Sequence, residues 1–500
     1  MQEGSLTPHD TGLCARNTPI TASRKPAATR NKQVGLRKNA CNRFIRPFTG
    51  GTGITIGYSG TGGAAFDRQT ARGSYYRLTF QVPMSSGSIH WLNSRRLRAH
   101  GSILALCLWS LYIWTIATPG LRDRNGNLKG TDFLHLYTLG SLAAAHRGSD
   151  LYDINAQAAL AAQRVPEAAG IRYLPLYPPQ VSIFFAPLAH FSYGWALILW
   201  WTCSATLYAI CCYSLWRVCP NLRGLGTTVI LLAVAFPAFF HMIAWGQTSA
   251  AALACFTGIF FLLRARREFL AGLVLGSLIF KPQLGLAAAI LFASLGAWKI
   301  VAGAALSAAG QLSVGVLYYG AQPLRTWLHM LRNVRAVLPL LEPKPYQTHS
   351  LRTFWSMLVP WPHLAFALYV LSAAAVLGLT IACWKRVPTV PLSLRYSALL
   401  LASVLVAPHL TVYDLVILAP AFILLADWLI SQNSTRSAWW LGTLLYLTYM
   451  LPLLGPFSRW THIQLSVIAM AATLYLIWNI SFARNSLAAD AGRPRSVESP

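Results

Sequence analysis

The sequence predicts an all-α, multi-pass membrane protein with about twelve transmembrane helices. Hydrophobic residues make up 55% of the chain and charged residues only 11%, whereas charged residues form about a quarter of an average soluble domain. The mean hydropathy is +0.46. Apolar runs of about 17 to 25 residues, each long enough to cross a bilayer, recur from Ile103 almost to the end of the chain. Since runs of this length satisfy their backbone hydrogen bonds internally only as helices, helices packed in lipid are expected.

Three regions differ in composition. Residues 1–98 are rich in Gly, Ser, Thr, Arg and Asn without hydrophobic periodicity, so a disordered, basic N-terminal tail is predicted. An alternative interpretation is a true start codon downstream, for example at Met84. Residues 99–484 are predicted to form the membrane-embedded domain and residues 485–500 a disordered C-terminal tail.

The positive charge indicates membrane topology rather than a nucleic-acid partner. The net charge is +27, and residues 1–100 hold 15 of the 41 Lys and Arg residues against three acids. Most of the remaining basic residues fall between apolar runs, which is typical of cationic loops beside membrane helices. No nucleic-acid reader motif accompanies the charge. The lipid bilayer is therefore the expected partner, and no nucleic acid is expected.

The basic residues before the first span orient the chain. The cluster Ser94–Arg98 precedes a span from Ile103 to about Thr118, which places the N-terminus in the cytoplasm. The first loop, about residues 119–179, is then external. It is predicted to contain an amphipathic helix at about 133–146 and a second helix at about 154–164.

A short apolar piece, Val181–Ala189, is too brief to cross the bilayer and is predicted to dip into the external leaflet. In the external segment at about 320–362, Arg325 and Arg332, with Arg335, are predicted to form the polar side of an amphipathic helix.

Several polar motifs are predicted to meet on the external face around one carboxylate. The chain has only 14 Asp and Glu residues, so Asp132, directly before the predicted amphipathic helix, is notable. It is predicted to be the catalytic base; the alternative, an N-cap of that helix, is compatible with this role. Ionisable groups near spans usually line a cavity or path. The other motifs on this face are the YPP turn with Tyr177, GQTS with Gln247, KPQ with Lys281, His349 with Arg352, and PHLTVYD with His409 and Asp414.

Each of these residues has a functional and a structural interpretation. Gln247 offers a donor and an acceptor to sugar hydroxyls, or it belongs to ordinary packing of small residues. Lys281 binds a donor phosphate, or it extends to the interface. His409 and Asp414 form a buried pair, or they contact phosphate and substrate respectively. Arg352 is predicted to bind phosphate, because a guanidinium can hold it through two hydrogen bonds. Tyr177 and Asp414, like Gln247, are assigned to substrate binding.

No Walker loop, dinucleotide fingerprint or HExxH motif is present, and the nine cysteines show no metal-ligand spacing. Neither a metal nor a cofactor is therefore expected. A membrane enzyme without a nucleotide site suits a donor that already stands in the membrane, namely a lipid-linked phosphosugar.

Five motifs in order resemble glycosyltransferase family 87, the polyprenyl-phosphate-mannose-dependent mannosyltransferases, over about residues 103–482. They are DFLHLYTLG with GSDLYD, YPPQVSIFFAPLAHF, AWGQTSAALA, LAGLVLGSLIFKPQLGL and APHLTVYDLVILAPA. The resemblance implies the glycosyltransferase C fold in the cell (inner) membrane, with the active site on the periplasmic or extracellular face. It also implies metal-independent, inverting transfer of a hexose, mannose in the family, from a polyprenyl-phosphate sugar to a glycan or glycolipid acceptor.

The family's motifs carry over to single residues. Its acidic residue after the first span matches Asp132, and its late external histidine matches His409. Its GQ and KP signatures match Gln247 and Lys281. The lead-in Arg122–Gly130 and the basic tail depart from the family pattern, which leaves the acceptor and the sugar open.

Two rival functions remain. A transporter or flippase would predict polar groups along a path across the membrane and an internal repeat, whereas here the groups gather at one end and no repeat is apparent. A lipid-dependent transferase for another sugar, such as arabinose or glucose, shares the motifs and is not separated from a mannosyltransferase by them.

Overall fold

The computed structural model describes residues 92–333, 344–385, 390–432 and 436–491. Within these ranges the chain is all-helical and contains no strand; two isolated β-bridges join Arg122 to Leu128 and Thr348 to Thr411. The predicted N-terminal tail lies outside the described residues up to position 91, and the predicted C-terminal tail lies outside them from position 492.

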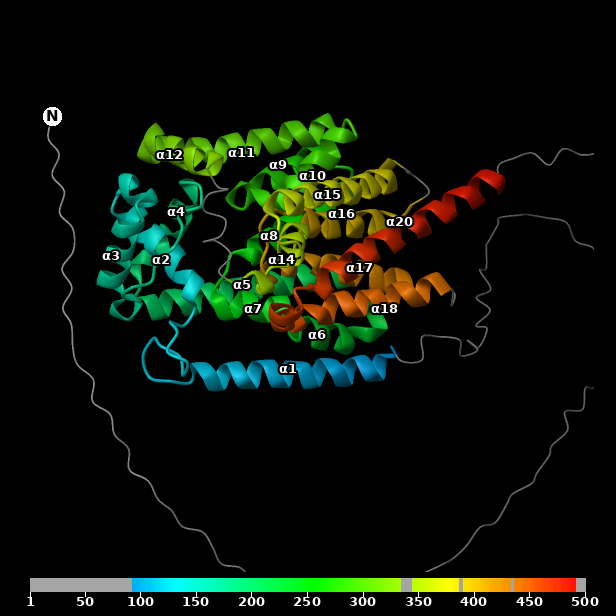
Figure 1. The fold of residues 1–500 in the computed structure, drawn as a ribbon, viewed down its shortest axis with the longest axis horizontal. Coiled ribbons are helices and arrows are strands. Elements are labelled where there is room, and N and C mark those ends of the chain that lie inside the picture. The colour runs from blue at the N-terminus through cyan, green and yellow to red at the C-terminus, as the bar shows by residue number, and fades with distance from the viewer. Residues whose placement is uncertain (1–91, 334–343, 386–389, 433–435, 492–500) are drawn as a thin grey trace, which may run out of the picture. The chain divides into compact units, whose positions relative to one another are not determined.

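The helices are labelled in Figure 1. In the first half of the chain they are α1 (Ser94–Ile116), α2 (Thr131–Ala144), α3 (Ile154–Arg164), α4 (Gln180–Phe185), α5 (Tyr193–Arg217), α6 (Gly226–Val234), α7 (Pro237–Trp245) and α8 (Ser249–Arg264). They continue with α9 (Glu268–Gly276), α10 (Pro282–Ser294), α11 (Trp298–Tyr319), α12 (Ala321–Arg332), α14 (Leu351–Leu358), α15 (Pro362–Lys385), α16 (Leu392–Val406), α17 (Ala419–Ile430), α18 (Arg436–Met450), α19 (Ser458–Thr461) and α20 (Leu465–Ala491).

Short 3-10 helices interrupt this order. They are η1 (Gly148–Tyr152), η2 (Pro166–Ala168), η3 (Ala186–His190), η4 (Pro220–Leu225), η5 (Ser277–Phe280), η6 (Pro345–Gln347), η7 (Val412–Leu418) and η8 (Leu451–Phe457). Five of them precede an α-helix directly or after one residue: η1, η4, η5, η7 and η8.

In the part of the chain that the structure describes, seven helical segments are long and apolar enough to cross a membrane, and an eighth results if the bent pair formed by η4–α6 and α7 is one span. Four shorter apolar helical segments accompany them: α8, η5 with α9, α10 and α16. The chain is therefore a membrane protein. The predicted number of about twelve spans is not confirmed by these lengths, because several apolar runs are divided by breaks.

Two helices extend past the predicted domain boundaries. Helix α1 begins at Ser94, inside the basic cluster that was assigned to the tail, because the Asn93 side chain accepts a hydrogen bond from the Arg96 amide and caps the helix there. At the other end, α20 continues to Ala491, past the predicted end of the membrane domain at residue 484. The residues after 484 include Leu and several Ala, which favour continued helix.

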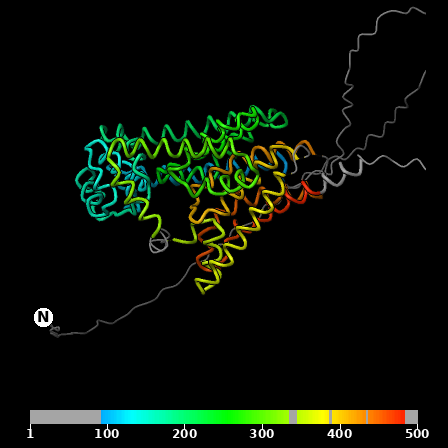
Figure 2. The backbone as a smooth tube through the Cα atoms, turned by 90° about the horizontal axis from the view of Figure 1, so that it is seen from above, coloured from blue at the N-terminus to red at the C-terminus, as the bar shows by residue number. Residues whose placement is uncertain are grey.

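The first-loop helix was predicted to be amphipathic, and this is wrong for α2. Every residue from Phe133 to Ala143 is buried, because α4, η3 and α3 pack around the helix. Gly140 permits the closest of these contacts, since a Cβ on it would lie 2.3 Å from the Phe185 carbonyl oxygen. Figures 1 and 2 show α2, α3 and α4 grouped together at one end of the described helices. The second predicted helix of the loop is confirmed as α3, with the predicted bounds.

Helix α12 confirms the prediction of an amphipathic helix in the segment at about 320–362. Arg325 and Arg332 are exposed, while Trp327 is buried and donates its indole N–H to the Leu176 carbonyl at 2.9 Å. Arg335 lies outside the described residues.

Helices α9 and α11 are packed backbone to backbone through glycines. A Cβ on Gly272 would lie 2.2 Å from the Ile300 carbonyl oxygen, and one on Gly303 would lie 2.3 Å from the Phe269 carbonyl oxygen. Small residues of this kind allow close packing of membrane helices, where dispersion contacts replace the hydrophobic effect as the driving force. The contact holds α9 in place and so positions the chain that leads from α9 through η5 to Lys281.

The glycine contact predicts a strong difference between two Gly→Ala substitutions on α11. Gly303→Ala should destabilise the protein by about 1–3 kcal/mol, because the new methyl group forces two backbones apart. Gly310→Ala is the matched control, since nothing lies within 4 Å of its Cβ position. Thermal unfolding of the purified protein in detergent measures both; equal midpoints for the two variants would contradict the close packing.

Candidate active site

Gln247 lies at the break between α7 and α8, beside the start of α2. Helix α7 ends at Trp245, and Gly246 adopts φ +73°, a conformation that favours glycine. A Cβ on Gly246 would lie 2.6 Å from the Cβ of Phe133, so this glycine also allows the break to approach α2. The approach brings Gln247 next to Asp132.

Asp132 lies in the first turn of α2 and does not cap the helix. The N-cap is Gly130, with φ +63°, and the helix start has no side-chain capping hydrogen bond. The capping interpretation is therefore wrong. The Asp132 carboxylate faces Gln247, and Gln247 Nε2 donates a hydrogen bond to Asp132 Oδ2. A position in the first turn still favours the ionised carboxylate through the helix dipole.

The Asp132 carboxyl is poised to exchange a proton near neutral pH. The side chain is half-buried, and burial, which disfavours the charged form, raises its pKa to about 6. The hydrogen bond from Gln247 and the positive charge of Lys281 act in the opposite direction, while the negative charge of Asp414 adds to the increase in pKa. A carboxylate with this pKa suits a general base.

Lys281 occupies the break between η5 and α10, where Pro282 begins the next helix. Its side chain is buried, and its ammonium lies 2.7 Å from Asp414 Oδ1. The ammonium also donates to Ser249 Oγ at 3.2 Å and to Gln247 Oε1 at 3.3 Å. Lys281 therefore connects the α7–α8 break with the segment that carries Asp414.

Asp414 lies in η7 and is only 2% exposed. Besides Lys281, its Oδ1 accepts a hydrogen bond from Ser249 Oγ at 2.6 Å. The Tyr413 ring lies 5.1 Å from the Lys281 ammonium, within the range of a cation–π contact. The charges of Lys281 and Asp414 can be buried because they pair with each other and make further hydrogen bonds.

Asp132, Gln247, Ser249, Lys281 and Asp414 thus form one connected group, which we call the polar cluster. Four of its members were predicted as site residues. Ser249 was not assigned a role, although it stands in the GQTS motif two residues after Gln247. Tyr413, in the PHLTVYD motif, was also not assigned. The sequence evidence for Ser249 and Tyr413 was that each lies within two residues of an assigned residue, Gln247 and Asp414 respectively.

Tyr177 adjoins the polar cluster. Burial raises the pKa of its hydroxyl, on which the charges of Lys281, Asp414 and Asp132 also act. The Tyr152 hydroxyl donates to the Tyr177 carbonyl at 3.1 Å, which fixes the YPP turn.

Arg352 and His409 form a second polar group: Arg352 lies in α14 and reaches the segment before η7, which carries His409. Arg352 Nε donates to the Pro408 carbonyl at 2.6 Å, and His409 is half-buried. The bridge between Thr348 and Thr411 and the Asp414 amide, which donates to the Thr411 carbonyl at 2.9 Å, connect this group with the polar cluster.

His349, predicted beside Arg352, packs behind this segment. It is 1% exposed, its amide donates to the Leu410 carbonyl at 3.0 Å, and its Nδ1 lies 2.7 Å from Ser466 Oγ. Burial lowers its pKa to about 3, so the ring is neutral at physiological pH.

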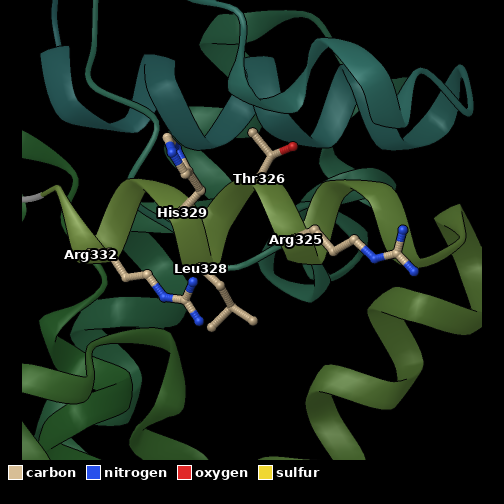
Figure 3. Close-up of a pocket in the computed structure, with 5 residues that line it drawn as sticks. All are labelled: Arg325, Thr326, Leu328, His329 and Arg332. Carbon is tan, nitrogen blue, oxygen red and sulfur yellow. The ribbon is translucent and has the colours of Figure 1, made fainter.

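Two surface cavities lie apart from the polar cluster. A cavity of about 460 Å³ is lined by Arg325, Thr326, Leu328, His329 and Arg332 of α12. Figure 3 shows His329 and Thr326 on one side of α12 and Arg325, Arg332 and Leu328 on the other. A cavity of about 370 Å³ is lined by Leu121, Arg164, Val165, Pro166, Ser192, Tyr193, Gly194, Trp195 and Ile198. Neither cavity is lined by a residue of the polar cluster.

The model of glycosyltransferase family 87 matches residues 176–412. This segment belongs to glycosyltransferase family 87. It includes Tyr177, Gln247, Lys281, Arg352 and His409, whereas Asp132 precedes it and Asp414 follows it. The family match and the apolar helices together identify a membrane glycosyltransferase.

No curated protein and no solved structure matches the chain. Within the described residues, no group of three or more His, Cys, Asp and Glu side chains is placed to hold a metal ion. The roles of the individual site residues stay predictions.

The buried ion pair of the polar cluster predicts a non-additive effect on stability. Lys281→Met should destabilise the protein by about 3 kcal/mol, because it leaves the Asp414 carboxylate buried without its partner. Lys281→Met with Asp414→Asn should cost less than the single variant, since no unpaired charge remains. Thermal unfolding in detergent measures both, and a double variant as unstable as the sum of the two singles would contradict a direct pair.

Proposed function

We propose that the protein transfers a hexose, most simply mannose, from a polyprenyl-phosphate sugar to a glycan or glycolipid acceptor, with Asp132 as the general base. The single observation that carries the proposal is the half-buried Asp132 carboxyl, whose pKa is raised to about 6 and which belongs to a buried polar cluster in a membrane glycosyltransferase. A carboxylate in this state removes a proton from a hydroxyl effectively at neutral pH.

The proposed reaction is a single displacement. The acceptor hydroxyl donates a hydrogen bond to Asp132, and its oxygen attacks the anomeric carbon of the donor from the side opposite the phosphate. The new C–O bond forms as the bond to the phosphate oxygen breaks, the proton passes to Asp132, and the configuration is inverted. Polyprenyl phosphate departs as an anion, so the proposed chemistry needs no general acid, metal or cofactor.

Arg352 and His409 are the groups we propose for the departing phosphate, because a guanidinium and an imidazole in a poorly hydrated site stabilise developing negative charge. Lys281, also predicted to bind this phosphate, already pairs with Asp414. Tyr177 and Gln247 are proposed to face the sugar, and Asp414 acts on substrate through Lys281 and Ser249.

The fold proposed for this activity is glycosyltransferase C, with the polar cluster on the periplasmic or extracellular face of the inner membrane. Supporting this, the breaks that carry Gln247 and Lys281 and the start of α2 meet at one place rather than along a path through the membrane. A path of polar groups is what a transporter would require.

Asp132→Asn should lower the rate of sugar transfer by a factor of about 10² to 10⁴, because the amide cannot accept the proton. The measurement is transfer of radiolabelled sugar from polyprenyl-phosphate mannose by membranes that contain the variant. Asp150→Asn is the matched control: it removes a carboxylate from the same loop that pairs on the surface with Arg147. Full activity of Asp132→Asn would reject the proposed base.

The proposed base also predicts the pH dependence of transfer. Since the pKa of Asp132 is raised to about 6, the protonated, inactive form should dominate below that pH, and kcat/KM should rise tenfold per pH unit up to about pH 6 and then level off. A pH profile of kcat/KM tests this. A profile that is flat between pH 4.5 and pH 7 would be inconsistent with a base of this kind.

A further inference from the structure

We propose that Lys281 is a positioning residue rather than a phosphate ligand: together with Asp414 it fixes the Gln247 amide, so that Gln247 holds Asp132 Oδ2 and Asp132 receives the acceptor's proton at Oδ1. This inference rests on the proposed function and deepens it. It assigns Asp132 Oδ1 as the atom that receives the proton. It also gives Lys281 the task of orienting the base and leaves Arg352 and His409 to bind the donor phosphate.

The hydrogen bonds of Lys281 are fully used inside the protein. An ammonium has three N–H donors, and three acceptors surround this one: Asp414 Oδ1 at 2.7 Å, Ser249 Oγ at 3.2 Å and Gln247 Oε1 at 3.3 Å. The Tyr413 ring lies 5.1 Å from the ammonium, and the side chain is only 6% exposed. A phosphate could bind Lys281 only by displacing one of these acceptors.

Lys281 also determines which way the Gln247 amide faces. The two ends of a side-chain amide have the same shape, so their neighbours decide the orientation. Lys281 can only donate, and it therefore requires the amide oxygen on its side. The amide nitrogen is then directed to Asp132, where its Nε2 donates to Oδ2.

The orientation of the amide selects the reacting oxygen of Asp132. Within the described residues, Oδ2 carries the hydrogen bond from Gln247, and no hydrogen bond to Oδ1 is present. A proton arriving at Oδ1 leaves the Gln247 contact intact, whereas a proton at Oδ2 would face the amide N–H. Asp132 is more exposed than Lys281 and Asp414, which are 6% and 2% exposed.

The charges of Lys281 and Asp414 act on the pKa of Asp132 in opposite directions, so the inference can be tested by the pH dependence of transfer. The positive charge lowers the pKa of Asp132 and the negative charge raises it. Removal of one partner should therefore shift the acid limb of kcat/KM one way, and removal of the other should shift it the opposite way. The position of a pH limb does not depend on how much of the variant is folded, provided that the folded fraction, measured alongside, is the same at every pH of the profile.

The experiment compares kcat/KM profiles of three variants in nanodiscs with polyprenyl-phosphate mannose as donor. Lys281→Met should move the acid limb up by about one pH unit, and Asp414→Asn should move it down. Gln247→Glu, which places a carboxylate between Lys281 and Asp132, should also move it up. In Lys281→Met the loss should appear in kcat, with the donor KM within about threefold of wild type.

Lys299→Met, which removes an exposed lysine at the start of α11, is the control and should leave the limb in place. A donor KM raised tenfold or more in Lys281→Met, with the acid limb unmoved, would overturn the inference and assign Lys281 to phosphate. Shifts of the same sign for Lys281→Met and Asp414→Asn would overturn it as well. If either variant does not accumulate, Gln247→Glu decides alone, and an unmoved limb there rejects the inference. Failure of the proposed function itself is distinct, because it would appear as full activity in Asp132→Asn.

Discussion

The ion pair between Lys281 and Asp414 is the interaction on which the candidate site depends. Taking two charges out of water costs several kcal/mol each, and only close pairing with further hydrogen bonds offsets this. Here the pair joins the η5–α10 break to η7 and reaches the α7–α8 break through Ser249 and Gln247. Three interruptions of apolar helices are thereby held together, and their polar side chains meet at the first turn of α2.

Much of the fold follows from the sequence, because apolar runs and their interruptions are local properties. The all-helical class, the bounds of α3 and a short apolar element at Val181–Ala189, where the structure has α4 followed by η3, were predicted from composition and spacing. The burial of α2 was not predicted. It depends on Gly140 and on contacts with α4 and η3, which lie about 40 residues further along the chain, and the hydrophobic periodicity of a helix does not reveal such contacts. The number of spans depends on whether broken runs count as one helix, which composition does not decide.

The site was predictable as a set of residues but not as a set of contacts. The scarcity of acids marked Asp132, and motifs at helix breaks marked Gln247, Lys281 and Asp414. That Lys281 would be paired within the protein could not be inferred, since it requires the side-chain directions of two breaks that are 133 residues apart. Ser249 and Tyr413 contact this ion pair, so their roles become apparent only once the pair is known. For this reason neither was assigned from the sequence.

The most direct test of the account is a cryo-EM structure of the protein in nanodiscs with polyprenyl-phosphate mannose bound. We expect the donor phosphate beside Arg352 and His409, the Lys281–Asp414 pair intact, and Asp132 facing the anomeric carbon across a space that admits one hydroxyl group. A phosphate bound by Lys281 with the pair to Asp414 broken, or a donor seated away from Asp132, would contradict it.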